Sequence, residues 1–269
     1  MTGWTPWCIV AACHIARDNM RLERDGPMGA KKRPRRRQQP KSSTTSRVPH
    51  PLTADALVYA EYDITDEPLD NRDLKRLPSQ VQARIDDLYE LAQHDPMQAI
   101  PELEHLVTAY PHIPLLSNYL CVAYLYSGDR EKTEACVRDT YRCHPQYLFA
   151  KVNYAHLCLQ QGEVAKIPDI FNHQCDLQRL YPHRTRFHLS EFTNFAGVMC
   201  RYFCAIGKRE TATLYYRMLK QVAPRHPMTK QAKRILYPPF WTRWLRTWAD
   251  NRLREHADTP QRSDTIWME

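Results

Sequence analysis

Residues 116–145 read LSNYLCVAYLYSGDREKTEACVRDTYRCHP, and this stretch decides the fold. Apolar residues recur at helical spacing ahead of Gly128, and a second helix-like pattern runs from there to Pro145. A glycine between two such patterns supplies a tight turn because it has no Cβ, and proline ends a helix that it cannot continue. The stretch therefore predicts two antiparallel helices joined at Gly128.

The same arrangement recurs along the chain at a regular interval. Gly162 repeats the position of Gly128 one interval later, and Gly207 precedes Pro224 by the same distance that separates Gly128 from Pro145. A degenerate earlier copy lies one interval before Gly128. The distance from Gly162 to Gly207 is longer, so extra residues within 175–191 lengthen a helix or form a loop. A regular interval of about 34 residues predicts a stack of repeated helix pairs.

This pattern resembles the tetratricopeptide repeats over roughly residues 80–227. Three copies carry it: Leu120, Cys121, Tyr124, Gly128, Asp129 and Pro145; Tyr154, Ala155, Cys158, Gly162, Ile167 and Phe171; Met199, Cys200, Phe203, Gly207, Ala212, Tyr216 and Pro224. The first-helix tryptophan of the family is absent. The resemblance implies an all-α fold, a right-handed α-solenoid of stacked antiparallel helix pairs. Pro101 and Pro168 fall inside second helices, where we expect them to kink or delay the helix.

In this family the first helix of each pair lines a groove that binds proteins. Carrying the pattern over implies these groove residues: Arg84, Leu88, Asn118, Val122, Leu125, Tyr126, Val152, His156, Leu159, Gln160, Asn194 and Arg201. The carboxylate clamp of chaperone-binding members is matched only at Asn153, so we do not expect that specificity. A mostly apolar groove suits an amphipathic helix or an extended peptide. The alternative is that the protein's own tail fills the groove.

A basic run marks the N-terminal region. Residues 1–50 hold 11 Lys and Arg against three Asp and Glu, whereas residues 51–269 are neutral overall. The run comprises Lys31, Lys32, Arg33, Arg35, Arg36, Arg37 and Lys41. Like charges and prolines predict a disordered tail that binds nucleic acid or an acidic protein, or acts as a nuclear localisation signal. A purely solubilising tail is the alternative.

The charges of the neutral part are sorted along the chain. Residues 51–140 hold 17 acidic and seven basic residues, and residues 201–262 hold four acidic and 14 basic residues. Because a solenoid keeps sequence order along its length, one end would be acidic and the other basic. This pattern is compatible with end-to-end self-association, with a partner of complementary charge, or with solvated helix faces that have no further role.

The two ends of the chain carry aromatic, apolar segments. Residues 4–13 read WTPWCIVAAC, too short to span a bilayer and preceded by no basic residue, and translation from Met28 is an alternative start. Trp241, Trp244 and Trp248 share one helical face, which predicts a C-terminal helix that caps the last repeat. An interfacial membrane helix is the less favoured alternative. We expect a soluble, cytoplasmic protein, or a nuclear one in a eukaryotic cell.

Residue patterns typical of catalysis or metal binding are missing from the sequence. It contains no Cys-x-x-Cys, phosphate-binding loop or serine–histidine–aspartate order, and His188 and Glu191 lack standard ligand spacing. Cysteines such as Cys121 and Cys200 occupy positions that favour small buried side chains, so we expect free thiols. We therefore predict no enzyme, no metal and no cofactor.

These observations predict five regions and an order of functions. The regions are a disordered basic tail (1–50), an acidic linker (51–79), helical repeats (80–227), Trp-rich capping helices (228–256) and a flexible end (257–269). The leading function is a non-catalytic protein-binding scaffold. A nucleic-acid-associated or ribosome-associated factor acting through the basic tail is the second, and an enzyme accessory or membrane-surface protein is the third.

Overall fold

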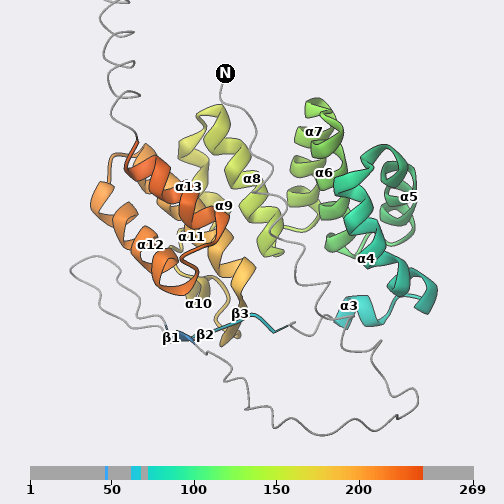
Figure 1. Cartoon of the computed structure of the whole chain (residues 1–269), viewed down its shortest axis with the longest axis horizontal. Helices are drawn as coiled ribbons and strands as arrows, with labels where there is room; N and C mark the ends of the chain where they lie inside the picture. The colour runs from blue at the N-terminus through green and yellow to red at the C-terminus, as the bar shows by residue number, and fades with distance from the viewer. Residues whose placement is uncertain (1–45, 48–61, 68–71, 239–269) are drawn as a thin grey trace, which may run out of the picture.

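The computed structural model describes residues 46–47, 62–67 and 72–238, and this part of the chain is mainly helical, as the sequence predicts (Figure 1). The α-helices are α3 (Arg72–Lys75), α4 (Ser79–His94), α5 (Pro96–Ala109), α6 (Pro114–Ser127), α7 (Arg130–Cys143), α8 (Leu148–Gln161), α9 (Ile167–Ile170), α10 (Leu177–Leu180), α11 (Leu189–Ala205), α12 (Arg209–Val222) and α13 (Pro227–Leu236). A 3₁₀ turn, η2 (Val164–Lys166), precedes α9. The strands are β1 (Ser46–Arg47), β2 (Asp63–Thr65) and β3 (Arg186–His188).

Glycines make the turns that the sequence predicts. Gly128 ends α6, Gly162 ends α8 and Gly207 follows α11, with φ angles of 81°, 78° and 78°. These are left-handed conformations that residues with a Cβ rarely adopt. Successive helices α4 to α8 pack against their neighbours, as do α11, α12 and α13. The predicted glycine turns are therefore present at all three positions, and long helices lie on both sides of Gly128 and Gly207.

The two prolines expected to disturb second helices behave differently. Helix α5 begins at Pro96, where Asp95 caps it, and continues through Pro101 without delay. By contrast, Pro168 lies in the first turn of α9, which ends at Ile170 after four residues. Asn172 and His173 then take positive φ angles of 51° and 58°, so the chain turns away from a helical path. The second helix of this copy is reduced to one short element.

The hydrophobic core consists of two clusters that share α8. One cluster joins α3 to α7, and the other joins β2, β3 and α8 to α13. Phe149 and Leu157 of α8 belong to the first cluster, whereas Val152 and Cys158 of the same helix belong to the second. Helix α8 therefore has no single apolar stripe, because both of its long faces are buried.

A small sheet corrects the purely helical prediction. Strand β2 pairs with β1 in antiparallel and with β3 in parallel orientation, with Ile64 opposite Phe187. Tyr62 and Ile64 are each only 4% exposed, and both belong to the core cluster around α11. Two side chains within the range predicted as a linker, Tyr62 and Ile64, are thus part of the hydrophobic core. The extra residues after Gly162 form a loop that holds α10 and β3.

Candidate functional site

The first helices α4, α6, α8 and α11 carry the residues predicted to line the groove. The structure buries most of them: Leu88, Asn118, Val122, Val152, His156, Leu159 and Asn194 are each at most 9% exposed. Leu88 and Val122 lie in one core cluster and Val152 in the other, so these three are packing residues. This corrects the prediction that they form an accessible surface. The faces of α4, α6 and α8 that carry these three residues are packed against neighbouring helices and not exposed to solvent.

The accessible part of the predicted groove is smaller and more polar. Tyr126 is 38% exposed, and Arg84, Leu125, Gln160 and Arg201 are half-buried. Arg84 donates two hydrogen bonds of 3.1 Å to the carboxylate of Glu102 on α5, and the bonded carboxylate raises the pKa of this guanidinium. This pairing ties Arg84 to its own helix pair. Tyr126 is the exposed aromatic side chain of the predicted set.

Buried polar side chains form a row on α6 and α8. We define this polar row as Asn118, Asn153 and His156. Asn153 Nδ2 donates a hydrogen bond of 2.8 Å to Asn118 Oδ1, which joins the two first helices. Asn153 Oδ1 accepts no hydrogen bond, and neither ring nitrogen of His156 has a partner. Buried polar atoms without a partner are rare in folded proteins, and the three side chains of this row are at most 5% exposed, so the row belongs to the interior between α6 and α8.

His156 is held in its neutral form. Its side chain is 4% exposed, and burial lowers its pKa to about 3, with a smaller contribution from the positive charge of Arg201 on α11. A neutral imidazole carries one N–H donor and one acceptor nitrogen. On α11, Asn194 has the same character as the polar row, because its Nδ2 donates to Ser190 O at 2.8 Å while its Oδ1 lacks a partner.

Comparisons with known proteins add no constraint to this geometry. No family model, curated protein or solved structure matches the chain. The functional argument therefore depends on the residues themselves.

Side chains of the insertion before α11 make contacts that stabilise the start of that helix. His188 and Glu191 form a capping box at the start of α11, in which Glu191 Oε2 accepts from His188 N at 2.9 Å. Glu191 also accepts two hydrogen bonds from Arg184, of 3.0 and 2.7 Å. These contacts show that both residues take part in the local structure at the start of α11. Within residues 46–47, 62–67 and 72–238 no group of three metal-binding side chains is present.

Two predicted elements lie outside the described residues. The basic run from Lys31 to Lys41 is one, and the tryptophan-bearing segment from Trp241 to Trp248 is the other. Helix α13, just before that segment, packs on α11 and α12 and so covers the last helix pair. In the part of the chain that the structure describes, no helix has the length and apolar character needed to cross a membrane.

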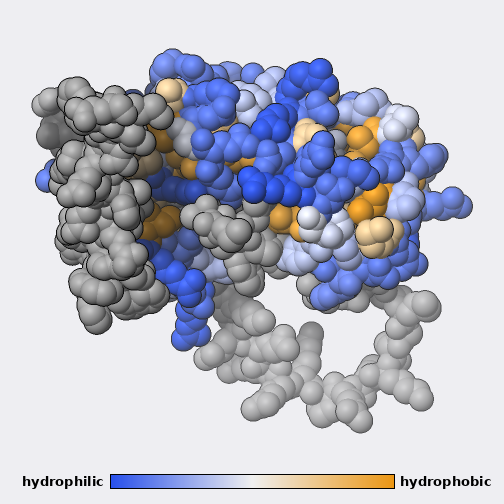
Figure 2. All heavy atoms as spheres, turned by 90° about the horizontal axis from the view of Figure 1, so that it is seen from above, coloured by the Kyte–Doolittle hydropathy of each residue, from blue (hydrophilic) through white to orange (hydrophobic). Residues whose placement is uncertain are grey.

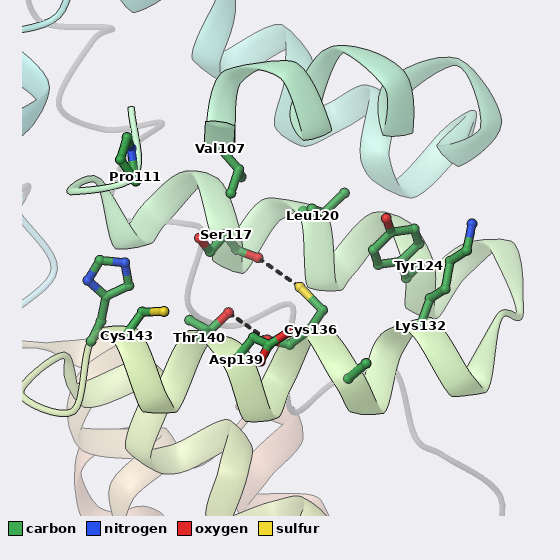
Figure 3. Close-up of a pocket in the computed structure, with 12 residues that line it drawn as sticks. Val107, Pro111, Ser117, Leu120, Tyr124, Lys132, Cys136, Asp139, Thr140 and Cys143 are labelled. Carbon is green, nitrogen blue, oxygen red and sulfur yellow. Dashed lines mark hydrogen bonds between the residues drawn. The ribbon is translucent and has the colours of Figure 1, made fainter. Parts of the chain in front are cut away.

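Sequence reasoning missed a groove between α5, α6 and α7. It encloses about 390 Å³, and its walls are mainly apolar, with Val107 on α5, Leu120 and Tyr124 on α6, and Cys136 and Cys143 on α7 (Figure 3). The volume falls within the range of small-molecule pockets. Helices α5 and α7 both pack against α6 but have little contact with each other, which leaves room for this groove. A single repeat gives no signal for it, since the groove depends on how two repeats are spaced.

Proposed function

We propose that this chain is a non-catalytic scaffold that binds a partner protein along the first helices of a right-handed α-solenoid similar to the tetratricopeptide repeats. The observation that carries the proposal is the exposed side chain of Tyr126 near the end of α6, on a series of helix pairs joined by left-handed glycine turns. An exposed aromatic side chain on a helical-repeat surface suits a helix or an extended peptide as the partner. The expected partner segment is extended or helical.

Tyr126 is the proposed entry point of the partner. It lies near the end of α6 and is exposed, and tyrosine is enriched where proteins bind each other. On the face seen in Figure 2, apolar side chains reach the surface as separate patches between hydrophilic ones. Large exposed apolar residues among those described are Met97, Tyr126, Ile206 and Tyr237. Of these, Tyr126 belongs to the predicted groove.

Site-specific photo-crosslinking tests this proposal. A benzophenone amino acid replaces Tyr126 in one full-length variant and Met97, which is 71% exposed on α5, in a matched control. We expect defined crosslinked proteins from position 126 that are weak or absent from position 97. Asn153→Ala, which removes the buried hydrogen bond from α8 to Asn118 on α6, should reduce the crosslinks from position 126 by loosening the helix that carries it. Equal crosslinking from both positions would contradict a specific groove.

The second candidate function rests on the basic run at residues 31–41. If the tail binds nucleic acid through phosphate contacts, affinity should fall roughly 10³-fold or more between 50 and 200 mM salt. Replacing its seven Lys and Arg residues with Gln in the full-length chain should abolish this binding and leave the crosslinks from Tyr126 unchanged. Loss of both activities together would mean that the tail is also part of the protein-binding site.

A further inference from the structure

Two cysteines meet between the helices of the best repeat. Cys121 on α6 and Cys136 on α7 are 15 residues apart, and their Sγ atoms are 2.7 Å from each other. A disulfide bond is about 2.05 Å long, so the two sulfurs need to approach by only roughly 0.7 Å. Cys121 is 1% exposed, whereas Cys136 is half-buried. Cys121 therefore supplies the buried sulfur of the pair, and Cys136 supplies the sulfur that is partly exposed.

The Cys136 side chain is accessible from the groove between α5, α6 and α7. Cys136 lines this groove, and its side chain points across to α6, where its thiol donates to Ser117 O at 3.6 Å (Figure 3). Mainly apolar walls with a volume of about 390 Å³ leave room for a small neutral oxidant. Cys121 is absent from the lining and is buried. We therefore expect an oxidant in the groove to reach Cys136 first, and Cys121 to react in the second step.

The hydrogen bond between the two thiols agrees with Cys136 reacting first and Cys121 second. The thiol of Cys121 donates to Cys136 Sγ, so Cys136 is the accepting sulfur of the pair. A thiolate is the reactive form of cysteine, and its oxidation to a sulfenic acid sets up attack by a neighbouring thiol. Cys143 lies on the same face of α7 and also lines the groove, but it is exposed and has no sulfur partner among the hydrogen bonds of the described residues.

We propose that Cys121 and Cys136 are a modification site that forms a disulfide on reaction with a hydroperoxide. The Cys136 thiolate attacks the peroxide, an S–O bond forms, the O–O bond breaks, and the released oxygen leaves as water or an alcohol after taking a proton. The Cys121 sulfur then attacks the Cys136 sulfenic acid, an S–S bond forms, and hydroxide leaves as water with the Cys121 proton. Two thiols and one hydroperoxide give one disulfide, one water and one water or alcohol.

The disulfide would fasten α6 to α7 within one helix pair. Helix α6 also carries Tyr126, so oxidation fixes the helix that presents part of the proposed partner surface. The site itself does not depend on that function, because it requires only the two thiols and the groove.

Peptide mapping of the oxidised full-length chain tests the site. Trypsin cleaves after Arg84, Arg130, Lys132 and Arg138, which places Cys121 alone in peptide 85–130 and Cys136 alone in peptide 133–138. After treatment with hydrogen peroxide and blocking of free thiols, we expect peptides 85–130 and 133–138 linked to each other and released by a reductant. Cys143, in peptide 143–151, should stay free and blocked.

Variants separate the pair from general thiol oxidation. Cys143→Ser should give the linked peptide in unchanged yield, and Cys136→Ser should give none. Cys121→Ala, checked for a native circular dichroism spectrum, should leave Cys136 as a sulfenic acid that a dimedone probe traps. The proposal is overturned if peptides 85–130 and 133–138 remain separate and alkylated, or if the linkage instead joins Cys200 and Cys204.

Discussion

At the scale of single residues, His156 couples the stability of the fold to pH. Its pKa is about 3 in the folded chain and 6.5 without the environment of the fold, so the unfolded chain binds a proton more readily. Stability is therefore complete above pH 6.5 and is lost as the pH falls toward 3. At pH 5 the expected loss is about 2 kcal/mol, because each pH unit between the two pKa values contributes about 1.4 kcal/mol.

Urea denaturation at pH 7 and pH 5 measures this effect. His156→Gln keeps a polar side chain of similar size but does not titrate, so the other ionisable groups cancel in the comparison. We expect wild type to lose about 2 kcal/mol more than the variant on going to pH 5. Equal losses would show that water reaches the imidazole in the folded chain and that His156 is not a buried neutral group.

The sequence identified individual residues better than it identified their surroundings. Asn118, His156 and Asn194 were selected from the repeat pattern, and the structure places the first two in the polar row. Their burial could not be predicted, because it depends on the packing of α8 against α6 and α11. The contact between Cys121 and Cys136 was missed for a related reason: the repeat pattern predicts a small buried side chain at Cys121, but it does not reveal which other sulfur that side chain meets.

At the scale of secondary-structure elements, Gly128 controls the turn between α6 and α7. Its φ angle is 81°, and a Cβ added there would meet no atom within 4 Å. Steric overlap with other residues is therefore excluded, and backbone strain alone sets the cost of a side chain. We expect Gly128→Ala to destabilise the protein by about 1 kcal/mol and Gly128→Asn by less, because Asn tolerates the left-handed region.

Thermal denaturation of the two variants checks this order. A neutral Gly128→Ala would mean that the turn relaxes to a negative φ angle. As an internal comparison, Ala135→Gly on α7 should also cost about 1 kcal/mol, but through lost helix propensity, and Asn at that position should not restore stability.

Helices and strands differed in how far the sequence predicted them. The long pairs carry a 3.6-residue apolar period and a glycine turn, which persist over about 30 residues and are easily recognised. Strand β2 has only the short alternation of Tyr62, Asp63, Ile64 and Thr65, in which the first and third side chains are buried. Three residues of strand with a partner more than a hundred residues away give too little local signal. The helix after Gly162 was overestimated because Pro168 and the two positive φ angles end it early.

At the scale of the whole molecule, β2 connects the beginning of the described chain to its C-terminal half. Strand β2 precedes α3 and α4, which belong to one core cluster, yet it pairs with β3 and packs in the other cluster (Figure 1). The Tyr62 ring contacts the Phe187 ring edge-on at a centroid distance of 5.2 Å. The chain thus crosses from one cluster to the other before the first long helix begins, and this crossing adds to the connection that α8 provides.

This arrangement makes Ile64 a test of whether residues 62–67 belong to the fold. Ile64 is 4% exposed within the core cluster, so Ile64→Ala should lower the free energy of unfolding by about 2–5 kcal/mol. Asp66→Ala, at an exposed position just after β2, should change it by less than about 0.5 kcal/mol. Urea denaturation of both variants at pH 7 gives the comparison. If residues 62–67 were a solvated linker, as their acidic composition alone suggests, the two substitutions would have equally small effects. A large loss confined to Ile64 would show that an N-terminal strand stabilises the C-terminal helices, and that a fragment beginning at α4 lacks part of the hydrophobic core.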